Sequence, residues 1–554
     1  MKRNLDNLAN KTFDVLVIGG GIHGTLAAWD AALRGLSVAL IERGDFGSAT
    51  SQNSLKIIHG GLRYLQDGNL ARIRTMARER TIWMKIAPHL VHPLTCLTPT
   101  RKKLSRSRLV LGGAMIANDL LSFDRNHLSD DEKHLPNGKL ISQRELSNLL
   151  SGYDVSNSTG AAVWHDAQVY NTERLLLDFI ISAADLGAEV ANYVEAIDLI
   201  RQGNRVTGAQ VRDNQSGQAF DIQARMVVNC AGAWIDNLLE KVSLRSDYST
   251  SVAMNIIVDK IWSGVAAGLP SQPSDGRLPQ ILFFVPWRNV TMIGTWHIPW
   301  NKAANAFKLN DDLVQDFLDE INSAHPQLQL TLEDVRHVTW GFLPVNKEDV
   351  CRKPIRLTRD SVLIDHEEDD NLQGMISALG VKYTTARVTA EKVMDMVVEK
   401  LNLKAKKCQT HITPVNGGRI DDFSVFTNRA QAEASHILEA GTTEHLVYTY
   451  GSEYRNLVQY ITAQPELAER VDRNLHVTKA EIVHAIDHEM ALTLADVIQR
   501  RTELGSVGLP SMAALQTCAE LMGHELGWDF SRQAQEVEAV IQSYAFKQME
   551  GVMA

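Results

Sequence analysis

The segment from Phe13 to Glu42, FDVLVIGGGIHGTLAAWDAALRGLSVALIE, decides the fold of the first part of this chain. It opens with a short apolar run rich in Val and Ile, which is typical of a strand buried on both faces of a parallel sheet. Glycines follow, then a stretch with small residues that predicts a helix, a second strand at 37–41 and an acidic residue. This order predicts the βαβ unit that binds dinucleotides.

The three spaced glycines have separate physical roles in such a unit. Gly19 permits the tight turn, Gly21 lets the backbone approach a pyrophosphate, and Gly24 lets the helix pack closely on the strand. Free N–H groups at the helix start favour an anion, and Glu42, about 20 residues on, is placed to accept hydrogen bonds from a ribose. FAD and NAD both use this unit, so it does not choose between them. The candidate cofactor contacts here are Gly19, Gly21, Ile22, His23, Gly24, Glu42 and Arg43.

The next segment, ATSQNSLKIIHGGLRYLQ at 49–66, points to a flavin. It resembles the segment that lies along the flavin in the FAD-dependent, respiratory, quinone-linked glycerol-3-phosphate dehydrogenase family. The resemblance implies FAD as the cofactor and assigns this segment to its pyrophosphate and isoalloxazine, and simple turn residues are the alternative for the serines. The positions it assigns are Thr50, Ser51, Ser54, Lys56, His59, Gly60, Gly61 and Leu62.

Later segments extend the resemblance along the chain. VVNCAGAW at 227–234 is similar to the family's strand and glycine turn that return to the nucleotide domain, and GMISALGVKYTTAR at 374–387 is similar to its late flavin motif. The stretch from YGSEY at 450–454 to Arg500-Arg501-Thr502 is similar to the family's helical C-terminal domain. The further cofactor candidates are Ala231, Gly232, Gly380, Lys382, Tyr383 and Thr384.

The resemblance also implies residues for alcohol oxidation, which requires hydride transfer to the flavin, removal of the hydroxyl proton and a cationic site for any phosphate. Arg63 and Tyr64 match positions that reach the substrate, Lys382 matches a lysine near the flavin, and Arg359 matches another active-site arginine. A structural ion pair at Arg63 and a surface lysine at Lys382 are the alternatives.

Two positions depart from the family pattern. Leu343, in GFLP, stands where the family has the arginine that grips the substrate phosphate, and Met254-Asn255-Ile256 aligns with a segment whose histidine acts in proton transfer. Leucine cannot make a bidentate contact to phosphate, so either other cations bind it or the substrate differs. Replacement candidates are Arg352, Lys353 and Arg356 for the phosphate, His297 as the base, and Trp287, Trp296, Trp300 and Trp340 as the wall of a larger apolar pocket.

Composition excludes several classes of protein. A net charge of -10 argues against nucleic-acid binding, although the segment 56–108 has twelve Lys and Arg against two acidic residues, a basic face that suits either solvent or an anionic surface. The five cysteines form no CxxC pair, so no metal site is expected. The N-terminus lacks a signal peptide's apolar region and no run is long enough to span a membrane. We therefore expect a cytoplasmic protein, peripheral at most on the inner face of the membrane.

The predicted fold class is α/β, or α+β overall: a Rossmann-like FAD-binding domain, an antiparallel-sheet substrate domain and a helical C-terminal domain. A linker near 403–418, with one proline and two glycines, marks the last boundary. The predicted parts are a discontinuous FAD-binding domain at 11–98, 154–239 and 340–401, a cap or membrane-facing insertion at 99–153, a substrate domain at 240–339 and the C-terminal domain at 419–554.

Three functions are compatible with these features. The first is FAD-dependent oxidation of the secondary alcohol of glycerol 3-phosphate or a related polyol derivative, phosphorylated or not, with membrane quinone as electron acceptor. The second is an amine or amino-acid oxidase, because the same architecture hosts C–N oxidation. The third is a flavin-binding protein without activity. The sequence leaves the oligomeric state open and is compatible with a homodimer.

Overall fold

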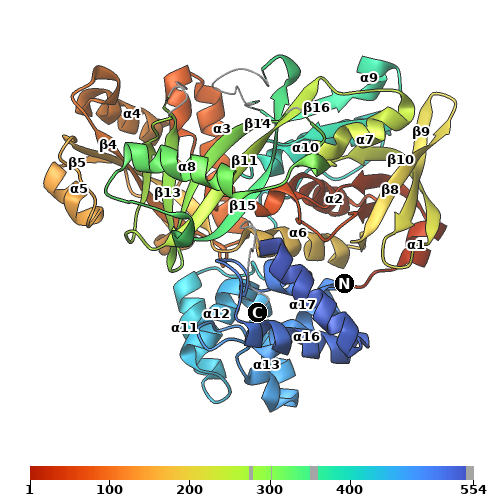
Figure 1. The fold of residues 1–554 in the computed structure, drawn as a ribbon. Coiled ribbons are helices and arrows are strands. Elements are labelled where there is room, and N and C mark those ends of the chain that lie inside the picture. The colour runs from red at the N-terminus through yellow and green to blue at the C-terminus, as the bar shows by residue number, and fades with distance from the viewer. Residues whose placement is uncertain (274–278, 301, 350–357, 359, 545–554) are drawn as a thin grey trace.

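The protein is described by a computed structural model over residues 1–273, 279–300, 302–349, 358 and 360–544. Two sheets lie side by side in the upper part of the molecule, and the C-terminal helices gather below them (Figure 1). The predicted combination of a Rossmann-like domain, a second sheet and a helical C-terminal region is confirmed.

The first sheet contains the dinucleotide-binding unit. Its central strands run in the order β17-β10-β1-β2-β7 and are all parallel, with β16 antiparallel at one edge. β8 and β9 continue from β10 as an antiparallel ribbon. The strands are β1 (Thr12–Ile18), β2 (Val38–Ile41), β7 (Glu189–Ala191), β8 (Val194–Gln202), β9 (Arg205–Asp213), β10 (Ala219–Asn229), β16 (Val362–Asp365) and β17 (Met375–Leu379).

Helix α2 (Ile22–Arg34) forms where the sequence predicts it, directly after β1. Gly35 ends it in the left-handed conformation (φ 87°), which glycine adopts without steric cost. Trp29 packs against Phe179, and both belong to the largest apolar core. That core fixes α2 between its two neighbouring helices, so the start of α2 is held rigidly at the sheet edge. The neighbours are α6 (Thr172–Asp185) and α10 (Ala386–Lys400).

The second sheet has the order β15-β11-β14-β13-β12-β4-β6-β3, with β5 paired to β6. It is antiparallel except where β12 pairs with β4. Helix α8 (Asp311–Ala324) covers one face through Phe317, which stacks on Trp296. The strands are β3 (Ile57–Ile58), β4 (Val91–Thr100), β5 (Lys139–Ile141), β6 (Gly160–Val169), β11 (Tyr248–Asp259), β12 (Ala266–Pro270), β13 (Ile281–Trp287), β14 (Val290–Trp300) and β15 (Val335–Asn346).

The second sheet takes in more of the chain than the range 240–339 proposed for a substrate domain. β3, β4 and β6 come from segments assigned to the FAD-binding domain, and β15 ends beyond the proposed limit. The reason is that β4 and β6 pair with each other along their whole length and then join β12. Strand partners so distant in sequence are not specified by local patterns.

Helices follow an irregular stretch with turns at 403–422 and form the lower part of the molecule (Figure 1). They have two apolar cores of their own. The helices are α11 (Phe423–Ala434), α12 (Ala440–Tyr450), α13 (Tyr454–Ala463), α14 (Lys479–Glu489), α15 (Leu494–Asp496), a π-helical turn (Val497–Arg501), α16 (Met512–Leu526) and α17 (Phe530–Tyr544).

Candidate functional site

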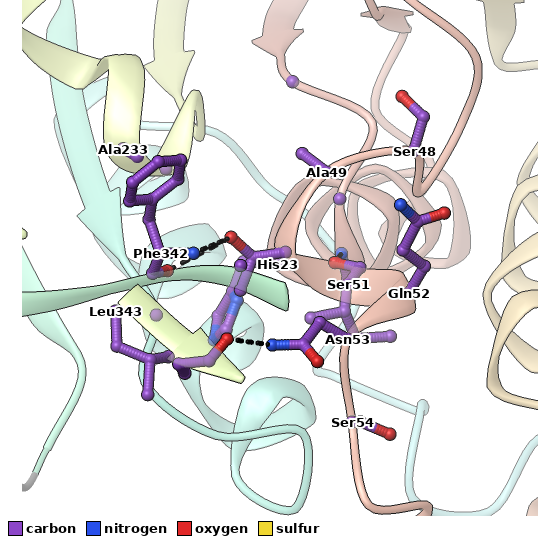
Figure 2. Close-up of a pocket in the computed structure, with 18 of the residues that line it drawn as sticks. His23, Ser48, Ala49, Ser51, Gln52, Asn53, Ser54, Ala233, Phe342 and Leu343 are labelled. Carbon is purple, nitrogen blue, oxygen red and sulfur yellow. Dashed lines mark hydrogen bonds between the residues drawn. The ribbon is translucent and has the colours of Figure 1, made fainter. Parts of the chain in front are cut away.

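A cavity of about 860 Å³ lies where the two sheets meet. Its floor is the carboxyl end of β1, β2 and β10, which is where ligands bind in open α/β sheets. Its wall is β11 and β15 of the second sheet. Figure 2 shows the segment from Ser48 to Ser54 on one side of the cavity, facing Phe342 and Leu343 on the other.

The start of α2 opens into this cavity. Gly21 caps the helix without any side-chain hydrogen bond, and the Oγ of Ser51 accepts from the N–H of Ile22 at 2.9 Å. A Cβ on Gly19 would lie 2.5 Å from the carbonyl oxygen of Cys230, so this backbone cradle accepts only glycine. The arrangement suits an anion, because helix N–H groups and the helix dipole point at the open space.

Glu42 lies beside the cradle at the end of β2. Its carboxylate accepts from the N–H of Gly20 at 2.7 Å and from the N–H of Gly44 at 2.9 Å. Burial raises the pKa of this carboxyl, while the two backbone hydrogen bonds favour its ionised form. Arg43 also lines the cavity, with its guanidinium 4.1 Å from the ring centre of Trp234.

The segment after the cradle ties the two sheets together. The hydroxyl of Thr50 donates to the carbonyl of Phe342 at 3.1 Å and accepts from the N–H of the same residue at 2.9 Å. Asn53 donates to the carbonyl of Ala253 at 2.8 Å (Figure 2). These bonds hold the cavity wall against its floor.

Lys56 and His59 both line the cavity, and hydrogen bonds tie each of them to another part of the chain. Lys56 is buried and its Nζ donates to both carboxylate oxygens of Glu173 at 2.8 and 2.9 Å. Burial lowers the pKa of Lys56 and the nearby carboxylate opposes this shift. The backbone N–H of His59 donates to the hydroxyl of Thr384 at 3.0 Å, which joins this segment to the late motif.

His23 and Gly380 form a tight contact across the cavity floor. A Cβ on Gly380 would lie 1.7 Å from the imidazole of His23, so the glycine is required for the ring to sit there. Burial lowers the pKa of His23 to about 4, which keeps the ring neutral near pH 7. Within the described residues, Nε2 of His23 is buried without a hydrogen-bond partner. This orphaned nitrogen suits a ligand atom in the cavity.

Most of the candidate cofactor contacts line the cavity, and four do not. Gly24 lies behind the cradle, where it packs α2 on β1. Gly60 donates from its N–H to Asp166 at 2.6 Å, while Gly61 and Leu62 begin the 3₁₀ turn Leu62–Asp67 that packs on α3 (Leu70–Ile86). The candidates that line the cavity are Gly19, Gly21, Ile22, His23, Glu42, Arg43, Thr50, Ser51, Ser54, Lys56, His59, Ala231, Gly232, Gly380, Lys382, Tyr383 and Thr384.

Four of the five candidate catalytic residues lie in the cavity lining or beside it. Lys382 lines the cavity, and its Nζ lies 5.3 Å from the ring centre of Tyr64. Arg63, Tyr64 and His297 lie outside the lining, and the side chain of Arg63 is exposed. His297 is close enough to Arg63 for the guanidinium to lower its pKa, although burial is the larger cause. We call Arg63, Tyr64, His297 and Lys382 the candidate catalytic cluster.

The imidazole of His297 is neutral near pH 7 and, among the described residues, has an unused ring nitrogen. Burial and then Arg63 lower its pKa to about 4, so the ring is neutral near pH 7. Its Nδ1 is buried and has no hydrogen-bond partner within the described part of the chain. A neutral imidazole with an unused nitrogen is the form that a general base requires.

The two positions that depart from the family pattern lie in the cavity wall or next to it. Leu343 lines the cavity and offers no charge there. Asn255 is buried behind the wall and donates to Asn53 at 2.8 Å. Trp287 and Trp340 line the cavity, whereas Trp296 and Trp300 pack on other aromatic rings. The remaining candidates, Arg352, Lys353, Arg356 and Arg359, lie outside the described residues.

Some lining residues were not predicted. Trp234 and Asn53 fall inside motifs that were recognised, so closer attention to those motifs would have found them. Gln499, Ser506 and Tyr544 also line the cavity, although they belong to the C-terminal region. No local pattern signals such long-range contacts, because they depend on how the helical region packs on the sheets.

Family models match the chain in two consecutive parts. Residues 14–391 match FAD dependent oxidoreductases, and residues 408–533 match the C-terminal domain of alpha-glycerophosphate oxidase. A glycerol-3-phosphate dehydrogenase of Synechocystis sp. is 33% identical over 542 residues, covering 95% of each chain. The chain belongs to the FAD-dependent glycerol-3-phosphate dehydrogenase family. It is an FAD-dependent oxidoreductase, as predicted.

Other members of the family and a solved structure agree with this assignment. The human mitochondrial glycerol-3-phosphate dehydrogenase is 29% identical, over 95% of this chain and 72% of that one. The crystal structure of the glycerol-3-phosphate dehydrogenase from Bacillus halodurans complexed with FAD shares the fold, with a TM-score of 0.77 and 22% identity over 99% of this chain and 97% of that one.

The residues around the cavity fit FAD. The helix start at Gly21 provides N–H groups for the pyrophosphate, and the Glu42 carboxylate can accept from ribose hydroxyls. The volume is within the range of cofactor sites, about 300–1,000 Å³. When bound, FAD supplies a two-electron acceptor for hydride transfer. Within the described residues, no group of three His, Cys, Asp or Glu side chains could hold a metal ion.

Proposed function

We propose that this protein oxidises the secondary hydroxyl of glycerol 3-phosphate to the ketone and passes the two electrons to a membrane quinone. The observation that carries the proposal is the match to a glycerol-3-phosphate dehydrogenase along 95% of both chains, which includes the C-terminal helices as well as the nucleotide domain. In this reaction the carbinol carbon loses a hydride, the hydroxyl loses a proton, and the quinone takes up two electrons and two protons.

The candidate catalytic cluster supplies the groups that the reaction needs besides FAD. His297 accepts the hydroxyl proton, since its imidazole is neutral and Nδ1 is unused within the described residues. Lys382, whose Nζ lies over the ring of Tyr64, places a positive charge next to the cavity. Arg63, which is exposed, is available to the substrate phosphate. Lys382 and Arg63 together replace the charge that Leu343 cannot offer.

Anaerobic mixing of the purified protein with glycerol 3-phosphate tests this function. We expect the flavin absorbance near about 450 nm to bleach, because the cofactor takes up the hydride, and to return when a soluble quinone is added without oxygen. Glycerol, which lacks the phosphate, is the matched control and should bleach the flavin much more slowly. A flavin that dithionite reduces but glycerol 3-phosphate does not would contradict the proposal.

The same experiment separates the alternative functions. Bleaching by amino acids or amines, followed by rapid reoxidation with release of hydrogen peroxide in air, would place the chain with the oxidases. Arg63→Gln provides a second measurement. Loss of one charged hydrogen bond to phosphate, about 1.5–3 kcal/mol, should raise KM for glycerol 3-phosphate by about 10-fold or more. An unchanged KM would remove Arg63 from the phosphate site.

Helix α4 (Arg108–Leu121) supports peripheral attachment to the membrane. Among the described residues, no helix is both long and apolar enough to cross a bilayer. α4 lies at the outer edge of the molecule, away from the C-terminal helices (Figure 1). Leu109 is 83% exposed and Leu120 is 70% exposed, and Phe123, just beyond the helix, is 74% exposed. An apolar helical face of this kind can enter the boundary between lipid headgroups and acyl chains.

The charges beside α4 favour an anionic lipid surface. Arg101, Lys102 and Lys103 precede the helix and are exposed. Basic side chains near an anionic bilayer gain about 1 kcal/mol each, so they add to the apolar insertion of α4. We propose that α4 and this basic segment dock the protein on the membrane that contains its quinone.

A further inference from the structure

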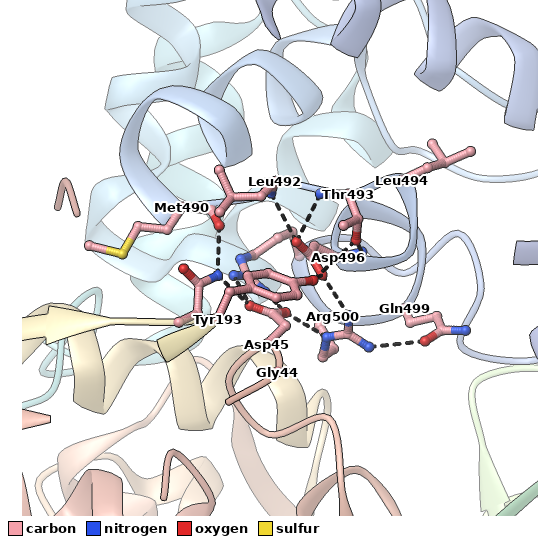
Figure 3. Close-up of polar contacts among 12 residues, drawn as sticks. Gly44, Asp45, Tyr193, Met490, Leu492, Thr493, Leu494, Asp496, Gln499 and Arg500 are labelled. Carbon is pink, nitrogen blue, oxygen red and sulfur yellow. Dashed lines mark hydrogen bonds and ion pairs between the residues drawn. The ribbon is translucent and has the colours of Figure 1, made fainter. Parts of the chain in front are cut away.

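A buried ion-pair cluster joins the C-terminal region to the nucleotide site. Asp45 follows directly on the turn Glu42–Gly44, whose residues line the cavity. Its carboxylate accepts from Nε of Arg500 at 2.5 Å and from both terminal nitrogens of Arg501 at 2.6 and 2.7 Å. Figure 3 shows Asp45 beside Gly44, with Arg500 reaching it from the C-terminal region. We call Asp45, Arg500 and Arg501 the arginine clamp.

The clamp is fully enclosed and its charges balance. Asp45 is 2% exposed and Arg501 is 1% exposed. Arg500 also donates to Asp496 at 2.7 Å, so two guanidinium groups face two carboxylates. The nearby guanidinium groups lower the pKa of Asp45 below its ordinary value, in spite of burial, which acts in the opposite direction. The bidentate contact of Arg501 fixes the orientation of the Asp45 carboxylate and also pairs its charge.

The backbone of the C-terminal region forms a π-helical turn where it supplies the two arginines of the clamp. Arg500 and Arg501 are consecutive and lie in the π-helical turn Val497–Arg501, and both side chains converge on one carboxylate. π-helical turns are rare and occur frequently at functional sites. Gln499, in the same turn, lines the cavity and accepts from Arg500 at 2.9 Å. The turn therefore contacts both the clamp and the cavity.

Other hydrogen bonds also hold the nucleotide turn. The carbonyls of Glu42 and Gly44 accept from the N–H groups of Val194 and Tyr193 at 2.7 and 2.8 Å. At Asp45 itself, Asn192 donates to the carboxylate at 2.9 Å and the N–H of Ser48 donates to the backbone carbonyl at 3.1 Å. Glu42 already uses its carboxylate on the N–H groups of Gly20 and Gly44. A shift of Asp45 would move Gly44, which would disturb the orientation of the Glu42 carboxylate toward the ribose.

We propose that the arginine clamp is a positioning device for FAD: the C-terminal region holds the turn Glu42–Gly44 in the shape that binds the adenosine half of the cofactor. Asp45, Arg500 and Arg501 act through Glu42 and Gly44 and do not touch the reacting atoms. The alternative is that the cluster stabilises only the packing of the C-terminal region on the sheets.

Asp45→Asn in the full-length holoenzyme separates these two roles. The matched control is Glu489→Gln. Glu489 forms an equally buried ion pair with Arg174 of α6, again between the C-terminal region and the first part of the chain. The backbone carbonyl of Glu489 accepts from Nε of Arg501 at 3.0 Å, and a side-chain substitution keeps this bond. Both substitutions remove one buried carboxylate charge that pairs with arginine, and both keep the side-chain size.

Two signals are followed as urea is added: the fluorescence of released FAD and the helical circular dichroism. We expect both transitions to coincide in the unsubstituted protein and in Glu489→Gln. In Asp45→Asn, FAD should leave at a clearly lower urea concentration than the one that unfolds the chain. Its release rate without urea should rise by about 10-fold or more, by comparison with the loss seen when groups that orient metal ligands are removed.

Two outcomes would reject the role of the clamp in FAD binding. If FAD release and unfolding coincide in Asp45→Asn, or if Glu489→Gln releases FAD as readily as Asp45→Asn, the clamp serves packing alone and the proposal is wrong. If Asp45→Asn does not fold, Arg500→Lys replaces it, because lysine keeps the charge and loses the guanidinium geometry. Release of FAD from Arg500→Lys below its unfolding transition supports the proposal, and coincident transitions reject it.

Discussion

Gly24 lacks a side chain and so lets α2 pack closely on β1 in the nucleotide unit. A Cβ at this position would lie 1.9 Å from the carbonyl oxygen of Gly19, so α2 would have to move away from β1. The sequence predicted this packing role, because glycine spacing is a local signal. The sequence did not reveal the contact between His23 and Gly380, since the two residues are brought together only by the sheet.

Gly24→Ala is expected to destabilise the holoenzyme by about 1–3 kcal/mol, as overpacking of a close contact does, and to weaken FAD binding. Urea unfolding and the flavin content of the purified protein measure both effects. The matched control is Gly113→Ala in α4, where no atom of the described residues lies within 4 Å of the added Cβ. This control should be neutral or more stable, because alanine favours a helix over glycine by about 0.5–1 kcal/mol.

His297→Gln is expected to lower kcat by about 10²–10⁴-fold, the usual contribution of a general base, with FAD content unchanged. His325→Gln is the control, since burial also lowers the pKa of His325 to about 4 and its partner is Tyr153, a residue that does not line the cavity. A loss of activity that is equal in the two variants would argue against His297 as the base.

The pH dependence follows from the same imidazole. A base with its pKa lowered to about 4 is deprotonated above that pH and loses activity only as the pH falls through it. We therefore expect kcat/KM to show no acid limb near about 6.5, the ordinary histidine value. An acid limb near 6.5 that disappears in His297→Gln would show that the pKa of His297 is not lowered in the working enzyme.

At the scale of elements, the sequence predicted β1, α2 and β2 of the first sheet. It did not predict which strands form the second sheet. β1, α2 and β2 follow one another, so their pattern is contained in about 30 residues. β4 and β6 pair over their whole length with α4 and α5 (Gln143–Leu149) between them. Such pairing depends on apolar surfaces that form only after folding.

Helix α4 gives an element-scale prediction. Leu109→Asp together with Leu120→Asp should reduce binding to vesicles containing anionic lipid, because about 1.5–3 kcal/mol of apolar burial is lost at each leucine. Co-sedimentation with vesicles measures this, and neutral vesicles test the contribution of the basic segment. Leu186→Asp, on the α6 side of the molecule and 51% exposed, is the control and should bind normally. Unchanged binding by the α4 variant would exclude this docking surface.

At the scale of the whole molecule, buried carboxylates set the response to acid. Arginine partners hold the pKa of Asp45 and Glu489 below the ordinary values of 3.8 and 4.5. Folded-state pKa values lower than unfolded ones give stability that is complete above the unfolded values and lost as the pH falls below them. The urea midpoint should therefore drop between about pH 5 and pH 3. In Glu489→Gln the drop should be smaller, and an identical drop would mean that this carboxylate does not contribute.

The contacts between the C-terminal helices and the nucleotide site are the part of the molecule that the sequence could not predict. The resemblance indicated a helical C-terminal region, but it gave no sign that Gln499 lines the cavity or that Arg500 meets Asp45. From the sequence alone, charged residues such as Arg500 cannot be told from solvent-exposed ones, because their partners are distant in the chain. The sequence could not predict the substrate preference for the same reason: the cavity wall around Leu343 is built from strands that are distant in sequence.

The ion pair between Asp45 and Arg501 joins residues that are 456 positions apart. A ribosome makes the first of them long before the second, at about 5–20 residues per second. The βαβ unit can fold while the rest of the chain is still being synthesised, but the turn after β2 meets its arginines only near the end of translation. We therefore expect nascent chains to hold flavin weakly and the cofactor to be retained firmly only once synthesis is nearly complete.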